Sequence, residues 1–354
     1  DRTTAAGPRD HGMRGRSPRS LAFAVARYGL ALAALAWVAT QVRLPAVLEL
    51  LGRLDAATIA GLLAVTVVGL LGRFDTWRVV IGEVRSVSLR TAAETDLVVN
   101  FVNQLLPSRL SGRVAAPFVL RSKTGMAYTD AVAVSGVHTG VYAVLYGLTA
   151  AVGLGLAATR LSAGVALLLA LSTGLYVASG AAVLLAGANL TVLDRVLGWV
   201  AGLCRRLPRV GAALADRVEA LFEFTASVAA AFRRLGATPG LWARYAVGWT
   251  LALVVAPGVR VLLLFGAFGV AFEPAVFLPL YLVAAYSVTL LPLTPGGIGV
   301  TEATATVVFV ALGVPSEVVV PVILIDRFLG VYLPALGGWY PSLGIDRADL
   351  TSGE

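Results

Sequence analysis

The chain has 354 residues, of which 58% are hydrophobic and only 14% are charged, and its mean hydropathy is +0.84. Soluble domains carry about 25% charged residues, so this composition, with its long apolar runs, excludes a soluble enzyme, a disordered chain and a DNA-binding domain. It predicts an all-α polytopic membrane protein. The formal net charge of +8 then reflects orientation in the membrane and contact with anionic headgroups, rather than nucleic-acid binding.

The apolar segments predict the course of the chain through the membrane. Residues 1–20 are rich in arginine, and we expect a disordered cytoplasmic tail there. A single transmembrane domain follows at 21–340, and then a tail at 341–354. Two short apolar segments, 91–106 and 275–291, run into clusters of proline and glycine. Six longer segments are predicted to be complete spans, at 21–42, 56–80, 128–157, 161–187, 243–268 and 317–340.

The distribution of arginine predicts the orientation of these spans. The connection at 190–242 holds seven arginines, whereas the connection at 158–160 holds only Arg160. Because basic loops stay on the cytoplasmic side, we expect a multi-pass protein of the cell membrane with a cytoplasmic N-terminus. Helical spacing of apolar residues in 214–234 favours an amphipathic helix on the membrane surface or under the bundle; the alternative is a solvated linker helix.

Two Leu-Pro segments resemble each other, LLPSRLSG at 105–112 and LLPLTPGG at 290–297. If each dips into the membrane and returns, the half-repeats at 21–157 and 161–340 each cross three times. An odd number of crossings makes the halves inverted, as in many transporters. This arrangement has six full spans and two re-entrant segments. If both breaks are instead ordinary turns, the chain crosses eight times.

Charged side chains cluster near these breaks and inside the later spans. An ionised side chain at the centre of a span costs about 2.5–3.5 kcal/mol, so each is expected to face a partner or water. Glu302 and Arg327 are the pair that we expect to form. The cluster predicts a wet, cationic pocket for a lipid phosphate, with buried ion pairs that only fix helix packing as the alternative. Its members are Arg109, Arg113, Arg260, Glu302, Asp326 and Arg327.

The motifs VNQLLPSRLSGRV at 102–114 and LLPLTPGGIGVTEA at 290–303 resemble the transmembrane domain of lysylphosphatidylglycerol synthases. This domain also occurs alone in flippase-like membrane proteins, without the aminoacyl-transferase domain. The resemblance implies a domain that translocates or handles polar lipids, with some members near lipid-linked glycan assembly. The second motif is intact, whereas Arg113 stands directly after Gly112, where the family has a glutamate.

Together the breaks and the resemblance predict a substrate-binding site along both motifs and the last span. A phosphate headgroup would meet arginine side chains and the backbone donors of the TPGGIG segment. The predicted residues are Asn103, Arg109, Arg113, Pro295, Gly296, Gly297, Gly299, Glu302 and Arg327, with Arg260 and Asp326 as further polar contacts.

The sequence lacks the motifs of the enzyme classes that we considered. Lys123 is the only lysine and no Walker motif surrounds it, and Cys204 is the only cysteine. With only His11 and His138, no H-E-x-x-H motif exists, and we interpret His138 as a packing histidine rather than a protease residue. We therefore expect no metal, no cofactor and no catalytic residue.

The leading hypothesis is a polar-lipid translocator without its own ATPase, acting on phospholipid or lipid-linked glycan. Its partners would be membrane lipids, anionic or phosphate-containing, together with a membrane or glycan-synthesis protein, and no nucleic acid. One alternative is an integral membrane glycosyltransferase, or its accessory subunit, acting on lipid-linked sugars. Another is a non-transporting membrane scaffold.

Overall fold

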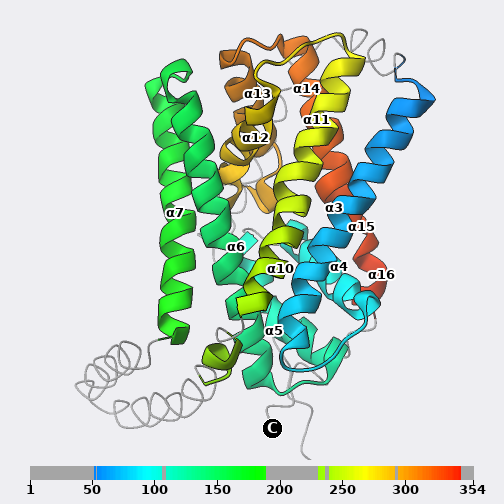
Figure 1. The fold of residues 1–354 in the computed structure, drawn as a ribbon, viewed down its shortest axis with the longest axis vertical. Coiled ribbons are helices and arrows are strands. Elements are labelled where there is room, and N and C mark those ends of the chain that lie inside the picture. The colour runs from blue at the N-terminus through cyan, green and yellow to red at the C-terminus, as the bar shows by residue number, and fades with distance from the viewer. Residues whose placement is uncertain are drawn as a thin grey trace, which may run out of the picture.

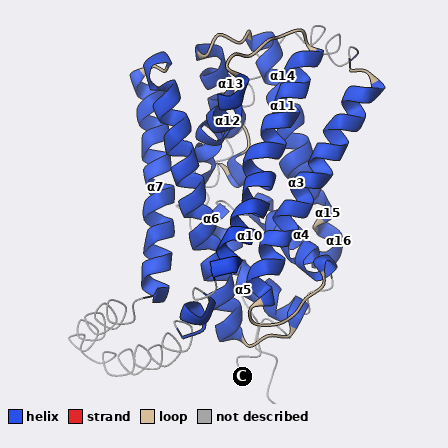
Figure 2. Cartoon of the chain, viewed as in Figure 1, coloured by secondary structure: helices blue, strands red, loops and turns tan. Residues whose placement is uncertain are grey.

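The computed structural model describes residue 52 and residues 54–105, 109–188, 230–235, 239–291 and 294–343. These residues form helices and connecting loops and contain no strand, which confirms the all-α fold class (Figure 2). The predicted span at 21–42, the N-terminal tail, residues 344–354 of the C-terminal tail and most of the connection at 190–242 lie outside the described residues. Within them, five helices are long and apolar enough to cross a membrane, and they match the other five predicted spans: Ala56–Gly82, Tyr128–Arg160, Ala163–Leu185, Gly240–Ala267 and Ser316–Ser342.

The first half of the bundle places a helical hairpin between two long helices. Helix α3 (Ala56–Gly82) runs from the top of Figure 1 to its lower end. Asp55 caps its start by accepting a hydrogen bond of 2.7 Å from the Thr58 N–H, and hydrogen bonds from Thr58 lower the pKa of this carboxyl. The hairpin of α4 (Leu89–Leu105) and α5 (Arg109–Thr124) occupies the lower half, and α6 (Tyr128–Ala157) returns to the top.

Helix α7 (Ala163–Ala188) runs down beside α6 at one side of the bundle (Figure 1). Gly140 and Gly180 face each other where these helices meet, and a Cβ added at Gly180 would lie 2.8 Å from the carbonyl oxygen of Gly140. Such small residues let membrane helices approach closely. Below α7, the short helical segment 230–235 packs Phe232 against Gly187, so this end of the predicted amphipathic region lies under the bundle.

The second half repeats the plan in the opposite direction. One long helix rises to the top in three consecutive parts, α10 (Pro239–Thr250), the π-helix η2 (Leu251–Val255) and α11 (Ala256–Ala267). A hairpin then enters from the top, formed by η3 (Ala275–Phe277), α12 (Leu278–Tyr286), η4 (Ser287–Leu290), η5 (Pro295–Gly297) and α13 (Val300–Ala311).

The last span descends into the lower half of the bundle, beside α4 (Figure 1). It begins with α14 (Ser316–Arg327), passes through the π-helix η6 (Phe328–Tyr332) and ends with α15 (Leu333–Gly337) and α16 (Trp339–Ser342). Within the described residues, the order of long helix, hairpin and long helix therefore occurs twice, with opposite directions. The division into half-repeats at 21–157 and 161–340 stays a prediction, because the span at 21–42 lies outside the described residues.

The tips of the two hairpins meet inside the bundle. Helices α4 and α5 pack against η5, and α5 also packs against η4. The contact is close, because a Cβ added at Gly296 would lie 2.0 Å from Oε1 of Gln104. Gly296 has a φ of +60°, a conformation that glycine adopts readily. The helix that runs through η3, α12 and η4, Ala275–Leu290, has 16 residues, and α13 has 12. At about 1.5 Å per residue, neither is long enough to cross a hydrocarbon core of about 30 Å.

Candidate functional site

A polar cavity lies between the two halves, in two adjoining chambers. The first, which we call the aromatic chamber, has a volume of about 140 Å³. The second, the arginine chamber, has a volume of about 80 Å³. Both are lined by Arg73, Tyr142, Gly330 and Val331. The aromatic chamber adds Trp77, Asp96, Asn100, Asn103, His138 and Trp249, and the arginine chamber adds Arg260, Tyr286, Asp326 and Arg327.

The π-helix η6 supplies backbone acceptors to this cavity. The carbonyl oxygen of Gly330 accepts a hydrogen bond of 3.3 Å from Nη1 of Arg73, and that of Val331 accepts one of 3.2 Å from Nδ2 of Asn100. In an α-helix the Gly330 carbonyl would bond the N–H four residues later, but Pro334 has none. The proline therefore frees a carbonyl for a side chain of the first half.

Arg73 also forms an ion pair within the first half. Its Nε donates to Oδ2 of Asp96 at 2.7 Å, and the two side chains are 18% and 8% exposed. Helix α3 thus carries a charged group into the centre of the bundle, where α4 supplies the counter-ion. A second pair lies in the other half, where Nε of Arg260 donates to Oδ1 of Asp326 at 2.8 Å. The Tyr286 hydroxyl donates to the other Asp326 oxygen at 2.9 Å.

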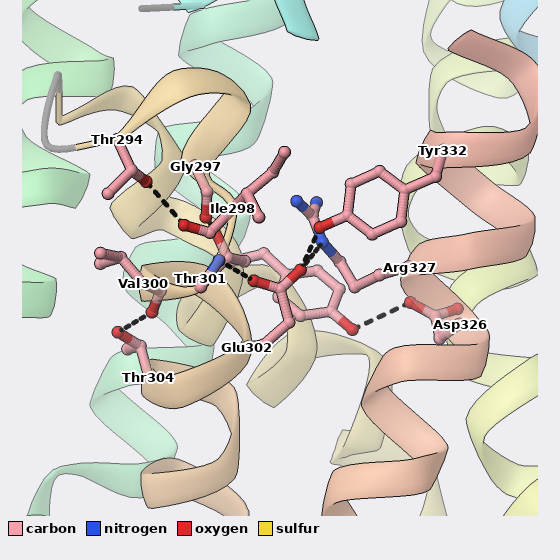
Figure 3. Close-up of polar contacts among 12 residues, drawn as sticks. Thr294, Gly297, Ile298, Val300, Thr301, Glu302, Thr304, Asp326, Arg327 and Tyr332 are labelled. Atoms are coloured by element: carbon pink, nitrogen blue, oxygen red, sulfur yellow. Dashed lines mark hydrogen bonds and ion pairs between the residues drawn. The ribbon is translucent and has the colours of Figure 1, made fainter. Parts of the chain in front are cut away.

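Glu302 connects the second hairpin to the last span (Figure 3). The N–H of Gly299 donates to its Oε2 at 2.7 Å, so the Glu302 side chain caps the start of α13. Its Oε1 accepts from Nε of Arg327 at 3.0 Å and from the Tyr332 hydroxyl. The Glu302–Arg327 pairing expected from the sequence is confirmed. The Gly299 N–H is thus bonded to Glu302, and the expectation that the TPGGIG segment offers backbone donors to a headgroup stays a prediction.

The described charged side chains of the site balance one another. Three arginines, at 73, 260 and 327, each pair with one of three carboxylates, at 96, 326 and 302. An unpaired charge inside a span is costly, so the fold supplies a counter-ion to each of these arginines. The side chains of Arg109 and Arg113 lie outside what the structure describes, so the cationic pocket stays a prediction.

Four polar atoms at the site lack a hydrogen-bond partner among the described residues. They are Nη2 of Arg327, Nη2 of Arg73, Nε1 of Trp249 and Oδ1 of Asn103. Of these, Nη2 of Arg73 lies in an ion pair, 2.7 Å from Oδ2 of Asp96. Arg327 is 2% exposed and Trp249 is 3% exposed, so bulk water does not reach them freely. Buried polar groups are normally paired, and unpaired donors and an acceptor in one cavity mark a place where a polar ligand can bind.

The predicted site residues are only partly brought together. Asn103 lines the aromatic chamber, and Arg327, Arg260 and Asp326 line the arginine chamber. Gly296 and Gly297 shape the hairpin tip, while η5 begins at Pro295. Helix α5 begins at Arg109 and includes Arg113, but the side chains of Arg109, Arg113 and Pro295 lie outside what the structure describes. The substrate-binding roles of all these residues stay predictions.

Sequence reasoning missed several residues of the cavity. Arg73 lies inside the predicted span 56–80, so the insertion cost that identified Arg260 applies to it equally. Asp96 lies inside the short apolar segment 91–106, so the cost of placing a charge in the membrane could have identified it as well. Trp77 and Trp249 carried no comparable signal, because an aromatic residue in a span is ordinary. His138 stacks on Trp77 with ring centroids 3.8 Å apart and contacts the Tyr245 hydroxyl at 3.2 Å, which agrees with a packing role.

This fold and site define a polytopic helical membrane protein with two opposed hairpins and buried ion pairs around a central cavity. The sequence model of the lysylphosphatidylglycerol synthase transmembrane region matches residues 20–338, and the chain belongs to this family. No curated protein and no solved structure gave a match. The family match confirms the resemblance seen in the two motifs, and with the apolar helices it makes the chain a multi-pass membrane protein connected with lipids.

Proposed function

We propose that this protein translocates polar lipids whose headgroup contains a phosphate. The observation that carries the proposal is the unpaired Nη2 of Arg327 in a cavity between the two halves. A guanidinium offers donors in a planar fork that fits phosphate oxygens, and its charge makes these hydrogen bonds strong. Arg260 lines the same chamber, so a phosphate there would meet two arginines.

The balance of charge explains how such a site could bind and release an anion. A bound phosphate would compete with Glu302 and Asp326 for the arginines. When the lipid leaves, the two carboxylates would pair with the arginines again, so no arginine would stay without a counter-ion. Glu302 would act as the switch, because it bonds the second hairpin through Gly299 and the last span through Arg327. Loss of either contact would free the hairpin tip to move.

The shape of the bundle supports alternating access. We propose that both hairpins are re-entrant, since their tips meet inside the bundle and α12 and α13 are short. The chambers of about 140 Å³ and 80 Å³ are smaller than the 300–1,000 Å³ typical of pockets for drug-sized ligands. A lipid headgroup would therefore enter only when the halves move apart, and this structure represents a closed state.

The basic lower end of the bundle supports the proposed orientation. Arg121 and Lys123 lie in the last turn of α5 there, and Arg85 follows the end of α3, so by the positive-inside rule this end is cytoplasmic. The plasma membrane is the proposed location. Arg109 and Arg113, at the start of α5, are proposed to attract the phosphate towards the first hairpin tip.

A flip assay in proteoliposomes tests the proposal. The purified protein is reconstituted with a trace of fluorescent anionic lipid, and the fraction of label accessible to a membrane-impermeant quencher is followed with time. We expect translocation by the protein and a loss of at least tenfold in Arg327→Gln. Glu317→Gln, at the exposed start of α14, is the control. No translocation above protein-free liposomes, with a lipid-linked sugar product formed instead, would overturn the proposal in favour of a transferase.

A further inference from the structure

Asp96 is held by fewer hydrogen bonds than the other two carboxylates of the site. Glu302 and Asp326 each accept hydrogen bonds through both of their oxygens, from an arginine and from tyrosine or backbone donors. The short contacts of Asp96 involve one oxygen, because Nε and Nη2 of Arg73 both lie 2.7 Å from Oδ2. The Trp77 side chain adds only a weaker hydrogen bond. Protonation of Asp96 would therefore disturb less of the surrounding structure than protonation of Glu302 or Asp326.

Asp96 also faces a space large enough for water. It lines the aromatic chamber of about 140 Å³, whereas Glu302 lines neither chamber. A cavity needs only about 10–15 Å³ to hold one water molecule, provided that polar partners are present. Nε1 of Trp249 and Oδ1 of Asn103 are an unpaired donor and an unpaired acceptor in this chamber. Water held there can deliver a proton directly to the Asp96 carboxylate.

The charged groups on the neighbouring helices leave Arg73 as the counter-ion of Asp96. Of the elements packed against α4, helix α3 presents Arg73, whereas Asp75 of the same helix pairs with Arg244 of α10. The short segments η5 and α15 contain no titratable residue. Tyr340 of α16 is 76% exposed. The described basic residues of α5 lie in its last turn, Arg121 and Lys123.

Helix α6 adds two titratable groups to the wall of the chamber, His138 and Tyr142. The His138 ring is stacked on Trp77, and its Nδ1 lies 3.2 Å from the Tyr245 hydroxyl. A phosphate bound to Arg73 would replace the carboxylate of Asp96 at the guanidinium. A buried carboxylate without a counter-ion binds a proton rather than staying charged, so Asp96 is the group whose protonation binding would change most.

Resting on the proposed function, we propose that Asp96 binds one proton whenever Arg73 binds a lipid phosphate, so that the lipid anion and the proton cross the membrane together. In the empty site Arg73 and Asp96 carry opposite charges. In the occupied site a phosphate oxygen takes the place of the carboxylate, and the carboxylate takes a proton from water. The total charge is zero in both states. Arg73 lines both chambers, so it can reach a phosphate in the arginine chamber.

The same exchange would release a contact between the two halves. Nη1 of Arg73 donates to the Gly330 carbonyl of the last span, at 3.3 Å. A guanidinium that turns from Asp96 towards a phosphate would weaken this hydrogen bond. The halves would then separate most readily when lipid and proton are both bound, which is the condition for coupled movement in one direction.

Proton uptake on binding tests the site without requiring transport. The purified full chain, in weakly buffered detergent solution, is mixed with short-chain phosphatidylglycerol, a phosphodiester that keeps its single negative charge, and the change in pH is measured. We expect about one proton to be taken up for each lipid bound. By linkage, the affinity should then fall about tenfold for each unit of rising pH over the range where uptake occurs.

Variants identify the proton acceptor. Asp96→Asn has no acidic proton, so its lipid binding should show neither proton uptake nor dependence on pH. Glu94→Gln, on the same helix, removes a carboxylate that pairs with Arg90 and Lys123 instead, and it should keep both. Uptake that persists in Asp96→Asn but is lost in His138→Gln would overturn the assignment. If Asp96→Asn does not fold, the original chain decides, because an affinity independent of pH would overturn the inference.

A pH gradient across proteoliposomes tests the coupling itself. The membrane potential is held at zero with potassium and valinomycin, and the outside is made one pH unit more acidic. Joint movement should concentrate fluorescent phosphatidylglycerol in the inner leaflet by up to about tenfold, and the opposite gradient should reverse this asymmetry. An even distribution under both gradients, in a protein that flips the label, would overturn the coupling while leaving translocation intact. Proton uptake on binding in a protein that flips no lipid would support the proton site and remove the translocation.

Discussion

Arg73 and Gly330 join the two halves of the bundle through one hydrogen bond, from the guanidinium Nη1 to the carbonyl oxygen at 3.3 Å. The same guanidinium pairs with Asp96 at 2.7 Å. Gly330 also lies against Arg260, since a Cβ added to it would be 2.6 Å from Nη2 of that arginine. The π-helix of the last span is thus held between an arginine from each half, and a change at either would reach the other through Gly330.

Replacing Pro334 tests whether the freed carbonyl matters. Pro334→Ala restores an N–H that can bond the Gly330 carbonyl and compete with Arg73. A hydrogen bond from a charged group contributes about 1.5–3 kcal/mol, so we expect the flip rate to fall about tenfold or more. Pro321→Ala, in the same span but away from the cavity, is the matched control. Equal flip rates in the two variants would show that the Gly330 carbonyl has no role in transport.

The Arg73–Asp96 pair should stabilise the folded protein mainly because either charge would be costly to bury without its counter-ion. Removing one partner of a buried pair costs about 3–5 kcal/mol, so Arg73→Leu, at a partly exposed site, should cost up to about 3 kcal/mol. Arg73→Leu/Asp96→Leu should be more stable than Arg73→Leu alone. The free energy of unfolding in detergent is measured for the single and the double variant. Arg90→Ala breaks an exposed pair with Glu94 and should cost less than about 1 kcal/mol. A double variant no more stable than Arg73→Leu would contradict this account.

Much of the fold could be predicted because the information is local. A long apolar run indicates a span wherever it lies, and five such runs coincide with long helices. Proline and glycine at 295–299 marked the break before α13, because neither residue favours an uninterrupted helix. The Glu302–Arg327 pair followed from the cost of charge inside a membrane, a rule that needs no knowledge of the neighbouring helices.

The cavity could not be predicted in the same way, because its walls come from residues far apart in the chain. Trp77 and Trp249 become neighbours only when α3 and α10 pack closely. That contact depends on Gly72 and Gly248, where each added Cβ would lie within 2.8 Å of the other residue's carbonyl oxygen. Glycines are frequent throughout this sequence, so nothing in its local pattern indicates which of them face each other.

The carboxylate of Glu302 should be required for both stability and transport. Glu302→Gln keeps the shape but leaves the Arg327 cation buried without its counter-ion, at a cost of about 3–5 kcal/mol. We expect a marked fall in the unfolding temperature in detergent and a loss of flipping. Glu302→Gln/Arg327→Met removes both charges, so it should regain stability but not flipping. Recovery of flipping in the double variant would show that the pair serves only to hold the helices together.

The contact between α6 and the second hairpin should tolerate no added side chain. A Cβ at Gly153 would lie 2.0 Å from the carbonyl oxygen of Leu280 and 3.1 Å from Cβ of Ala284, so Gly153→Ala must push α12 away from α6. Overpacking of this kind costs about 1–3 kcal/mol, and displacement of α12 would disturb the hairpin tip. We expect a lower unfolding temperature and slower flipping.

Gly155→Ala provides the matched control, two residues further along the same helix. A Cβ at Gly155 would meet no atom within 4 Å, and alanine favours a helix over glycine by about 0.5–1 kcal/mol. This variant should be as stable as the original chain or slightly more so, and it should flip lipid at the same rate. If Gly153→Ala matched it in both measurements, the close packing of α6 against α12 would not be what holds the second hairpin in position.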